Sequence, residues 1–358
     1  MPGSASAAIA NDVKAAPTRT LIVDDSVVVR TVLERILVAH ADFSVVHKTS
    51  NAEQALALLA QHDVDLVLLD VEMPGQSGLV ALPAILEASK GARVVILSAN
   101  CEEGSAASVE ALALGASDII SKPVAGSFGD QFSSALLQRL GRLNVSAPSV
   151  RQAEAGVTLR PAPMTALTCL AIGASTGGIH ALAQLFAGMR RAPGVPVLVT
   201  QHLPRSFIPY FAEQLARMTS LPVSIARPGQ HIQPDNVYIA PGEGNLELRQ
   251  SRGGDVIVSI SADRAPSGPM PAVDPMFSAM ARLYGPGCCA IVLTGMGRDG
   301  ATGAHDVVDV GGWVIAQDQT TSTVWGMPGS VARAGLASAL LPPGEIMDFI
   351  ASHAGVEA

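Results

Sequence analysis

The chain has 358 residues, which is enough for two domains that each bury a core. Its net charge of -8 leaves no basic surface for phosphates, so we expect no nucleic-acid partner. The four cysteines lack disulfide or zinc-ligand spacing, and no apolar run reaches about 18 residues, so we predict a cytoplasmic protein without direct membrane insertion.

The first part of the chain alternates short β-branched runs with helical stretches. Such alternation predicts an α/β domain with a doubly wound, five-stranded parallel sheet. We assign residues 1–18 to a disordered N-terminal arm and residues 19–137 to this first domain. The predicted strands are 21–23, 43–47, 66–69, 94–97 and 118–121, and the predicted helices are 26–40, 52–61 and 103–114.

Residues 138–165 are predicted to be a linker, because the apolar periodicity stops there and Ser, Ala, Pro, Gln and Arg dominate. Residues 166–352 resume the alternation, which predicts a second, Rossmann-like α/β domain. A hairpin at 246–260 adds an antiparallel insertion. The predicted strands are 167–172, 197–201, 223–226, 237–240, 291–294 and 313–316, and the predicted helices are 179–189, 207–219 and 276–283.

Polar residues follow the strands of the first domain. Because the carboxyl ends of parallel strands meet at one edge of a sheet, we expect a cluster there, made of Asp24, Asp25, Asp70, Ser98 and Lys122. Three carboxylates repel each other unless a hard cation such as Mg²⁺ binds among them. Asp70 can then attack a phosphoryl donor, while Ser98 and Lys122 contact the phosphoryl oxygens. Taken singly, each aspartate is also typical of a turn or a helix cap.

Residues 19–137 resemble the receiver domain of two-component response regulators. The matching stretches are Leu-Ile-Val-Asp24-Asp25-Ser26, Leu-Leu-Asp70-Val-Glu72-Met-Pro74, Leu97-Ser98-Ala99 and Ser121-Lys122-Pro123. The resemblance implies that a histidine kinase phosphorylates Asp70, and that Asp25 and Asp70 bind Mg²⁺ through their side chains. It also implies a backbone carbonyl ligand from Glu72 and a water-mediated contact from Asp24. The loop at 75–78 departs from the family, which more often has Asp before the last glycine.

Ser175 lies in a Gly-x-Ser-x-Gly pattern between a predicted strand and a predicted helix. Small neighbours expose the hydroxyl at such a turn, and the helix N-terminus supplies N–H donors, so Ser175 is a candidate nucleophile. A glycine-rich turn of this kind also suits a dinucleotide pyrophosphate. The acid that would bind the ribose is absent, because the next predicted strand ends in Thr200-Gln201-His202.

A serine hydroxyl needs a base, and His202 is the best-placed histidine because it ends the next predicted strand. His180 is closer in sequence, but it should point away from the turn. We choose Asp299 to orient the imidazole, because it lies in a glycine-rich loop after a later strand, although it equally suits a helix N-cap. The order Ser, His, Asp differs from that of the α/β-hydrolases.

The second domain resembles the chemotaxis methylesterase family. The matching stretches are Ala-Ile-Gly-Ala-Ser175-Thr-Gly-Gly, Gln201-His202-Leu-Pro204, Ile239-Ala-Pro241-Gly242, Leu293-Thr-Gly-Met-Gly-Arg-Asp299-Gly and Trp325-Gly-Met-Pro328. The resemblance implies a Ser175 nucleophile, a His202 base and an Asp299 orienter. It also makes the backbone N–H of Met296 a donor to the oxyanion and places Thr176 near the site. Arg298 stands where some relatives carry Asn.

The resemblance implies hydrolysis of glutamate methyl esters on methyl-accepting chemoreceptors, with release of methanol, and also deamidation of receptor glutamines. It implies Mg²⁺ in the receiver domain and no cofactor for the esterase reaction. We hypothesise that the unphosphorylated receiver covers Ser175. Two alternatives stay open: a response regulator whose second domain only binds a partner or a dinucleotide, and an esterase for small molecules with a vestigial receiver.

Overall fold

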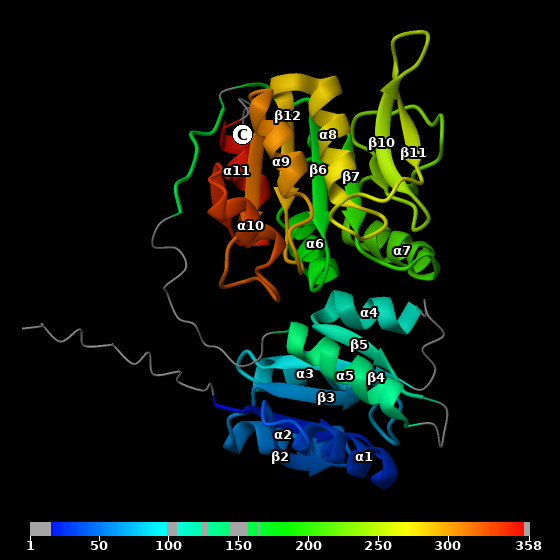
Figure 1. Ribbon diagram of the computed structural model, residues 1–358, viewed down its shortest axis with the longest axis vertical. Helices are drawn as coiled ribbons and strands as arrows, with labels where there is room; N and C mark the ends of the chain where they lie inside the picture. The colour runs from blue at the N-terminus through cyan, green and yellow to red at the C-terminus, as the bar shows by residue number, and fades with distance from the viewer. Residues whose placement is uncertain (1–15, 99–105, 124–127, 144–156, 164, 354–358) are drawn as a thin grey trace, which may run out of the picture.

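The computed structural model describes residues 16–98, 106–123, 128–143, 157–163 and 165–353. These residues form two α/β bodies, one built around a five-stranded sheet and the other around a seven-stranded sheet (Figure 1). Most of the predicted arm, the predicted helix start at 103 and half of the predicted linker lie outside the described residues. Among those residues no helix is both long enough and apolar enough to cross a membrane.

The N-terminal sheet has five parallel strands in the order β2-β1-β3-β4-β5, which confirms the predicted fold class. Its first strand begins at Thr18, inside the segment that we had assigned to the arm, and pairs there with Phe43. The strands are β1 (Thr18–Val23), β2 (Phe43–Thr49), β3 (Leu66–Asp70), β4 (Arg93–Ser98) and β5 (Asp118–Ser121).

Helices cover both faces of this sheet. The helices are α1 (Val27–Val38), α2 (Ala52–Gln61), α3 (Gly78–Ala88), α4 (Ala106–Leu114) and α5 (Asp130–Arg142). One buried cluster joins α1 and α5 to the sheet, and another joins α2, α3 and α4 to its other face. Helices α3 and α5 were not predicted. Pro83 lies inside α3, and a proline in the sequence predicts the end of a helix. Helix α5 continues past residue 137 to Arg142, so the linker begins later than the predicted boundary at 138.

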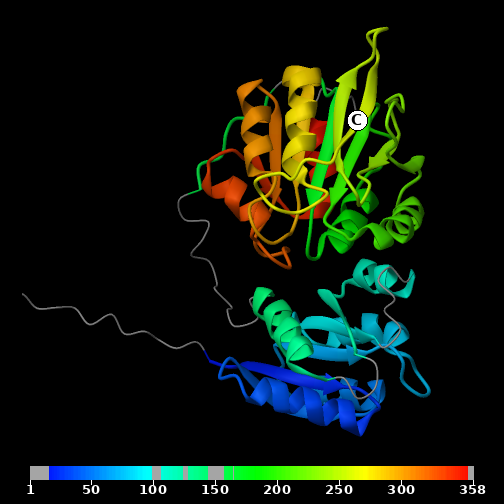
Figure 2. The same ribbon diagram turned by 45° about the vertical axis from the view of Figure 1, so that its right-hand side comes forward.

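The C-terminal sheet has seven parallel strands in the order β14-β13-β12-β6-β7-β9-β8. The strands are β6 (Cys169–Ala174), β7 (Val197–Gln201), β8 (Val223–Ile225), β9 (Val237–Ile239), β12 (Cys288–Val292), β13 (Trp313–Gln317) and β14 (Ala339–Leu341). The predicted hairpin is present as an antiparallel pair, β10 (Asn245–Gln250) and β11 (Val256–Ser261), whose tip points away from the receiver (Figure 2). Strand β14 was not predicted from the sequence, although the equally short strands β8 and β9 were.

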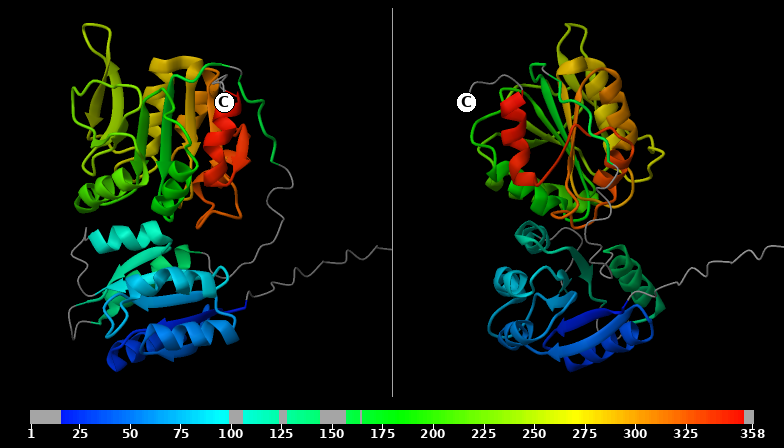
Figure 3. Two further views of the ribbon diagram at one scale, coloured as in Figure 1. Left: turned by 180° about the vertical axis from the view of Figure 1, so that it is seen from behind. Right: turned by 90° about the vertical axis from the view of Figure 1, so that its left-hand side faces the viewer.

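The second sheet is also covered on both faces, as Figure 3 shows. Its helices are α6 (Gly178–Ala187), α7 (Ile208–Met218), α8 (Val273–Tyr284), α9 (Ala301–Asp309), α10 (Met327–Arg333) and α11 (Pro343–His353), with 3-10 turns η1 (Arg205–Phe207) and η2 (Gly285–Gly287). One cluster packs α6, α7 and α11 on the sheet, and the other packs α8, α9 and α10 on the opposite face. Helices α9, α10 and α11 were not predicted.

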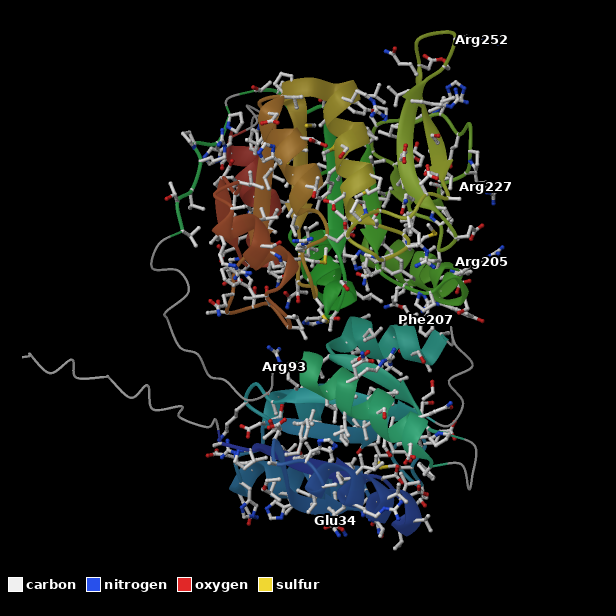
Figure 4. All side chains as sticks on the ribbon, viewed as in Figure 1. Glu34, Arg93, Arg205, Phe207, Arg227 and Arg252 are labelled. Atoms are coloured by element: carbon white, nitrogen blue, oxygen red, sulfur yellow. The ribbon has the colours of Figure 1, made fainter. Side chains whose placement is uncertain are left out.

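Helix α4 of the first body packs against α6 and α7 of the second. Val109 of α4 is 1% exposed and belongs to the buried cluster formed by the second body. Arg93, at the start of β4, donates a hydrogen bond of 3.3 Å to the carbonyl of Ser322, and Figure 4 shows it at the edge of its sheet that faces the second body. The carboxyl edge of the second sheet, where Ser175 lies, therefore faces the receiver.

Replacing Phe211 with Ala should lower the free energy of unfolding by about 3–5 kcal/mol, because the ring is fully buried in the cluster that supports α7. Urea denaturation followed by circular dichroism measures this change. Tyr210, the neighbouring residue on the same helix, is 39% exposed, so Tyr210→Ala is the matched control and should change the value by less than about 0.5 kcal/mol. Equal effects of the two substitutions would contradict this description of the core.

Candidate active site and phosphoryl-acceptor site

Ser175 lies in the turn between β6 and α6, as the sequence pattern predicts. Gly177 has a φ of +77°, a conformation that favours glycine. A Cβ atom on Gly295 would lie 2.7 Å from the Cβ of Ser175, so only glycine allows this loop to approach the serine. The two glycines thus bring the turn and the loop after β12 together around one hydroxyl.

His202 directly follows β7, the strand beside β6. Ala174 pairs with Gln201 in the sheet, and the N–H of His202 donates to the carbonyl of Ala174 at 3.0 Å. This register makes Ser175 and His202 neighbours at the carboxyl edge. Both side chains line one cavity of about 630 Å³. No hydrogen bond joins the two side chains among the described residues.

Asp299 binds His202 with a distance of 2.7 Å between Oδ2 and Nε2. The same Oδ2 accepts the N–H of Val273 at 2.7 Å, and Oδ1 accepts the N–H groups of Asp274 at 3.1 Å and Gly300 at 3.0 Å. The carboxylate is only 2% exposed, and four donors compensate its charge. The alternative cap role is not seen, because Gly300 is the N-cap of α9 and Asp299 accepts the N–H of that residue and none from the first turn of the helix.

Burial acts to raise the pKa of Asp299, but the hydrogen bonds from His202 and Val273 outweigh it and hold the pKa below its ordinary value. Asp299 therefore stays ionised at neutral pH. Because its partner is Nε2, the proton on that nitrogen fixes the neutral tautomer of His202 and leaves Nδ1 as an acceptor.

Thr176 and Met296 line the same cavity as Ser175. Their backbone N–H groups donate no hydrogen bond to any described residue. The loop that carries Met296 is fixed on both sides, since Gly295 donates to the carbonyl of Val324 at 3.0 Å and accepts from Met327 at 2.8 Å. Two free donors on a rigid frame beside a serine can stabilise a developing oxyanion.

Two positioning residues were given no role from the sequence. The Nε2 of Gln201 donates to the carbonyl of Ser175 at 2.8 Å, which anchors the serine turn. Thr294 donates through its hydroxyl to the carbonyl of Thr176 at 3.0 Å and accepts the N–H of Val324 at 2.9 Å. Both residues lie in stretches that match the family, Gln201 beside His202 and Thr294 beside Leu293, and this position was the available signal.

His180 points away from the cavity, as expected. Its Nδ1 lies 2.9 Å from the carbonyl of Ala113, in the last turn of α4, and its Nε2 lies 3.0 Å from Nε2 of Gln184. Because the amide of Gln184 donates to Nε2, the proton of the neutral imidazole is on Nδ1 and faces Ala113. His180 is therefore a contact between the two bodies and not a second base for Ser175.

Residues of the receiver also line the cavity that contains Ser175. They come from the end of α4, from β5 and the residue before it, and from α5 and the residue after it, and include Leu112, Ser117, Asp118, Arg139 and Leu143. On the opposite side the cavity is lined by Phe207, which Figure 4 shows at the edge nearest to α4. The receiver thus forms part of the wall of the serine site.

The receiver residues also meet at one edge of their sheet. Carboxylate oxygens of Asp24, Asp25 and Asp70 lie within 4.8 Å of one another. The Nζ of Lys122 lies 2.7 Å from Asp24 and 2.8 Å from Asp70. Burial raises the pKa of Asp70 above its ordinary value despite the contact with Lys122. Oxygen ligands whose negative charge is only partly compensated fit Mg²⁺.

Ser98 and Glu72 lie at the same edge. Ser98 ends β4 and is 8% exposed, and its carbonyl accepts the N–H of Lys122 at 2.8 Å. The N–H of Glu72 donates to Oδ1 of Asp70 at 3.1 Å. The predicted acceptor, metal and phosphoryl-contact residues are therefore brought together at this edge.

Comparison with known proteins agrees with this arrangement. The family model for the CheB methylesterase matches residues 170–350, and the model for the response regulator receiver domain matches residues 20–127. The chain belongs to the CheB methylesterase family. This confirms the resemblance predicted from the sequence for both parts of the chain. The dinucleotide alternative gains no support, because the residue after β7 is His202 and it binds Asp299.

Two relatives match almost the whole of this CheB-family chain. A protein-glutamate methylesterase/protein-glutamine glutaminase of Caulobacter vibrioides is 39% identical over 94% of the chain and 99% of its own length. One from Rhodospirillum rubrum is 35% identical over 93% of the chain and 94% of its own length. The crystal structure of the Thermotoga maritima CheB methylesterase catalytic domain matches with 34% identity and a TM-score of 0.50, covering 52% of the chain and 99% of that domain.

Magnesium should raise the melting temperature of the wild type but not of Asp70→Asn. With the cation at about 100 times its Kd, the gain in stability is about 2.7 kcal/mol. Without the cation, Asp70→Asn should be more stable than the wild type at neutral pH, because the raised pKa of Asp70 makes its ionised form unfavourable in the folded state. This difference should vanish below about pH 3.9, where both states protonate the carboxyl.

Thermal scans with MgCl₂ or with EDTA measure both effects. Asp63→Asn is the matched control, because Asp63 is an aspartate of the same body whose side chain is 82% exposed. A magnesium shift that persisted in Asp70→Asn would place the cation elsewhere.

Proposed function

We propose that this chain is a phosphorylation-activated protein-glutamate methylesterase that hydrolyses glutamate methyl esters on methyl-accepting chemoreceptors. The observation that carries the proposal is the meeting of Ser175 with the His202–Asp299 pair in one cavity beside two free backbone donors. The curated relatives named above carry the same activity in their names. A cytoplasmic location, where chemoreceptor signalling domains are exposed, fits this role.

The reaction begins when the hydroxyl of Ser175 attacks the ester carbonyl of the methylated glutamate. Nδ1 of His202 takes the hydroxyl proton, and Asp299 stabilises the imidazolium through Nε2. The oxyanion of the tetrahedral intermediate accepts hydrogen bonds from the N–H groups of Met296 and Thr176. His202 then returns its proton to the leaving methoxide, and methanol departs from an acyl-enzyme.

Water hydrolyses the acyl-enzyme in a second cycle of the same proton transfers. His202 takes a proton from water, the hydroxide attacks the acyl carbonyl, and the proton returns to Ser175 as glutamate leaves. A glutamine side chain follows the same path with ammonia as the leaving group, so we include deamidation of receptor glutamines in the proposal. No step draws on a cofactor.

Phosphorylation of the receiver controls this site in our proposal. A histidine kinase donates the phosphoryl group to Asp70, and Lys122 and Ser98 then bind the phosphoryl oxygens. Mg²⁺ bound by Asp25, Asp70 and the backbone carbonyl of Glu72, with Asp24 acting through water, would compensate the charge of the phosphoryl group.

The connection to the esterase site runs along β5. Lys122 directly follows this strand, while Asp118, its first residue, lines the cavity of Ser175. A shift of Lys122 toward a phosphoryl group therefore reaches the surface that covers the serine. We propose that this shift loosens the packing of α4 on α6 and α7 and admits the receptor.

Methanol release from methylated receptor membranes tests the chemistry. Ser175→Ala should lower the rate by a factor on the order of 10⁴ to 10⁶, and Asp299→Asn by about 10⁴, because the imidazole loses its oriented tautomer. Asp70→Asn should keep the basal rate and lose the increase that a small-molecule phosphodonor with Mg²⁺ gives the wild type. Release by Ser175→Ala at the wild-type rate would exclude Ser175 as the nucleophile.

Replacing Val109 with Asp should raise methanol release without phosphodonor by about tenfold or more. Val109 is buried between the bodies, and loss of its burial removes about 1.5–3 kcal/mol of docking free energy. Glu110→Ala is the matched control, because Glu110 is exposed on the same helix and should leave the rate unchanged. A Val109→Asp protein that stayed folded and kept the low basal rate would contradict occlusion by the receiver.

A further inference from the structure

Asp274 is a second buried carboxyl group beside the serine site, and the reaction described above does not use it. It lies in the first turn of α8 and is 9% exposed. Its Oδ1 accepts the N–H of Gly303, in the first turn of α9, at 2.9 Å. Helix α9 has Gly300 as its own N-cap and receives no side-chain cap from it. Asp274 therefore caps α9 from the neighbouring helix.

The same residue contacts the carboxylate that holds His202. The backbone N–H of Asp274 donates to Oδ1 of Asp299 at 3.1 Å. This contact brings the two carboxyl groups together, and the charge of Asp299 helps to raise the pKa of Asp274. Asp274, Asp299 and His202 thus form a continuous series that ends at the cavity of Ser175.

The ionised form of the Asp274 side chain is unfavourable in the folded protein. Burial is the largest cause that raises its pKa, and the charge of Asp299 adds to it. A helix cap alone needs only an oxygen acceptor, which Asn or Ser supplies without a buried charge. The cap alone therefore does not explain why residue 274 is an aspartate, whereas a function of its negative charge in the reaction does.

Few charged groups lie near the carboxyl group of Asp274. Asp299 faces Asp274 directly, and His202 lies behind it. The next carboxylate on α9, Asp306, is bound to the hydroxyl of Ser278 at 2.5 Å. On the side of β10, Arg282 of α8 is directed to the carbonyl of Leu248. Among the described residues no basic side chain forms an ion pair with Asp274.

We propose that Asp274 is a positioning residue for the reaction, which holds the start of α9 together with Asp299 and strengthens His202 as a base through its negative charge. This inference rests on the proposed function. A negative charge behind Asp299 stabilises the imidazolium relative to the neutral ring, so His202 gains affinity for the proton of Ser175. The neutral amide of Asp274→Asn keeps the acceptor for Gly303 and removes only the charge.

The test is the pH profile of kcat/KM for methanol release by the full chain, with saturating phosphodonor and Mg²⁺ at every pH. Removing the charge should make the imidazolium of His202 less favourable, so the acidic limb of Asp274→Asn should move to lower pH by about 0.5 to 1 unit. Its plateau should fall several-fold, because a weaker base takes the serine proton less readily. Asp306→Asn is the matched control and should keep the wild-type limb and plateau.

The unfolding temperature separates positioning from a purely structural role. Asp274→Asn should be at least as stable as the wild type at neutral pH, because a group with a raised pKa opposes folding when ionised, and this difference should disappear in acid. An unchanged acidic limb with an unchanged plateau overturns the proposal, and so does a loss of activity that only follows a loss of stability. Absence of methanol release by the wild type would instead contradict the proposed function itself.

Discussion

The buried carboxylate of Asp299 is the charge on which the serine site depends. It is 2% exposed, so folding requires donors for both of its oxygens, and these come from three segments: the residue after β7, the start of α8 and the start of α9. The segments meet only because small residues allow it. A Cβ atom on Gly173 would lie 2.4 Å from Val273, whose N–H binds Asp299, so glycine in β6 lets α8 reach the site. Glycine in this domain therefore not only allows turns but also brings N–H donors close to the buried carboxylate.

The receiver also buries carboxylates, but their negative charge is only partly compensated. Its carboxylates at Asp24 and Asp70 are also buried, but Lys122 is the one cation within ion-pair distance of both among the described residues. The remaining negative charge keeps the site able to accept a cation and a phosphoryl group. The serine site has its charge fully compensated and is fixed, whereas the receiver site is left incompletely compensated and can change. Strand β5 connects the two, with Lys122 at one end and Asp118 at the other.

Much of this arrangement could be predicted from the sequence, because residues after parallel strands must gather at one edge. Asp24, Asp70 and His202 were placed by that rule, and Ser175 by its Gly-x-Ser-x-Gly pattern. Other features could not be predicted in the same way. Helix α3 carries Pro83, whose ring argues locally against a helix, while tertiary burial of Leu82 and Ile85 favours it. Gln201 and Asp274 act through contacts with residues distant in sequence, which periodicity does not record.

In our proposal, the docking of α4 against the second body lets phosphorylation of the receiver control the serine site. The most direct measurement is the rate at which a serine-reactive phosphonate labels the full chain, with the labelled residue located by mass spectrometry, before and after phosphorylation of the receiver. We expect a single label on Ser175 that forms faster after phosphorylation. A label on another residue, or a rate on Ser175 that does not depend on the phosphoryl group, would contradict the proposal.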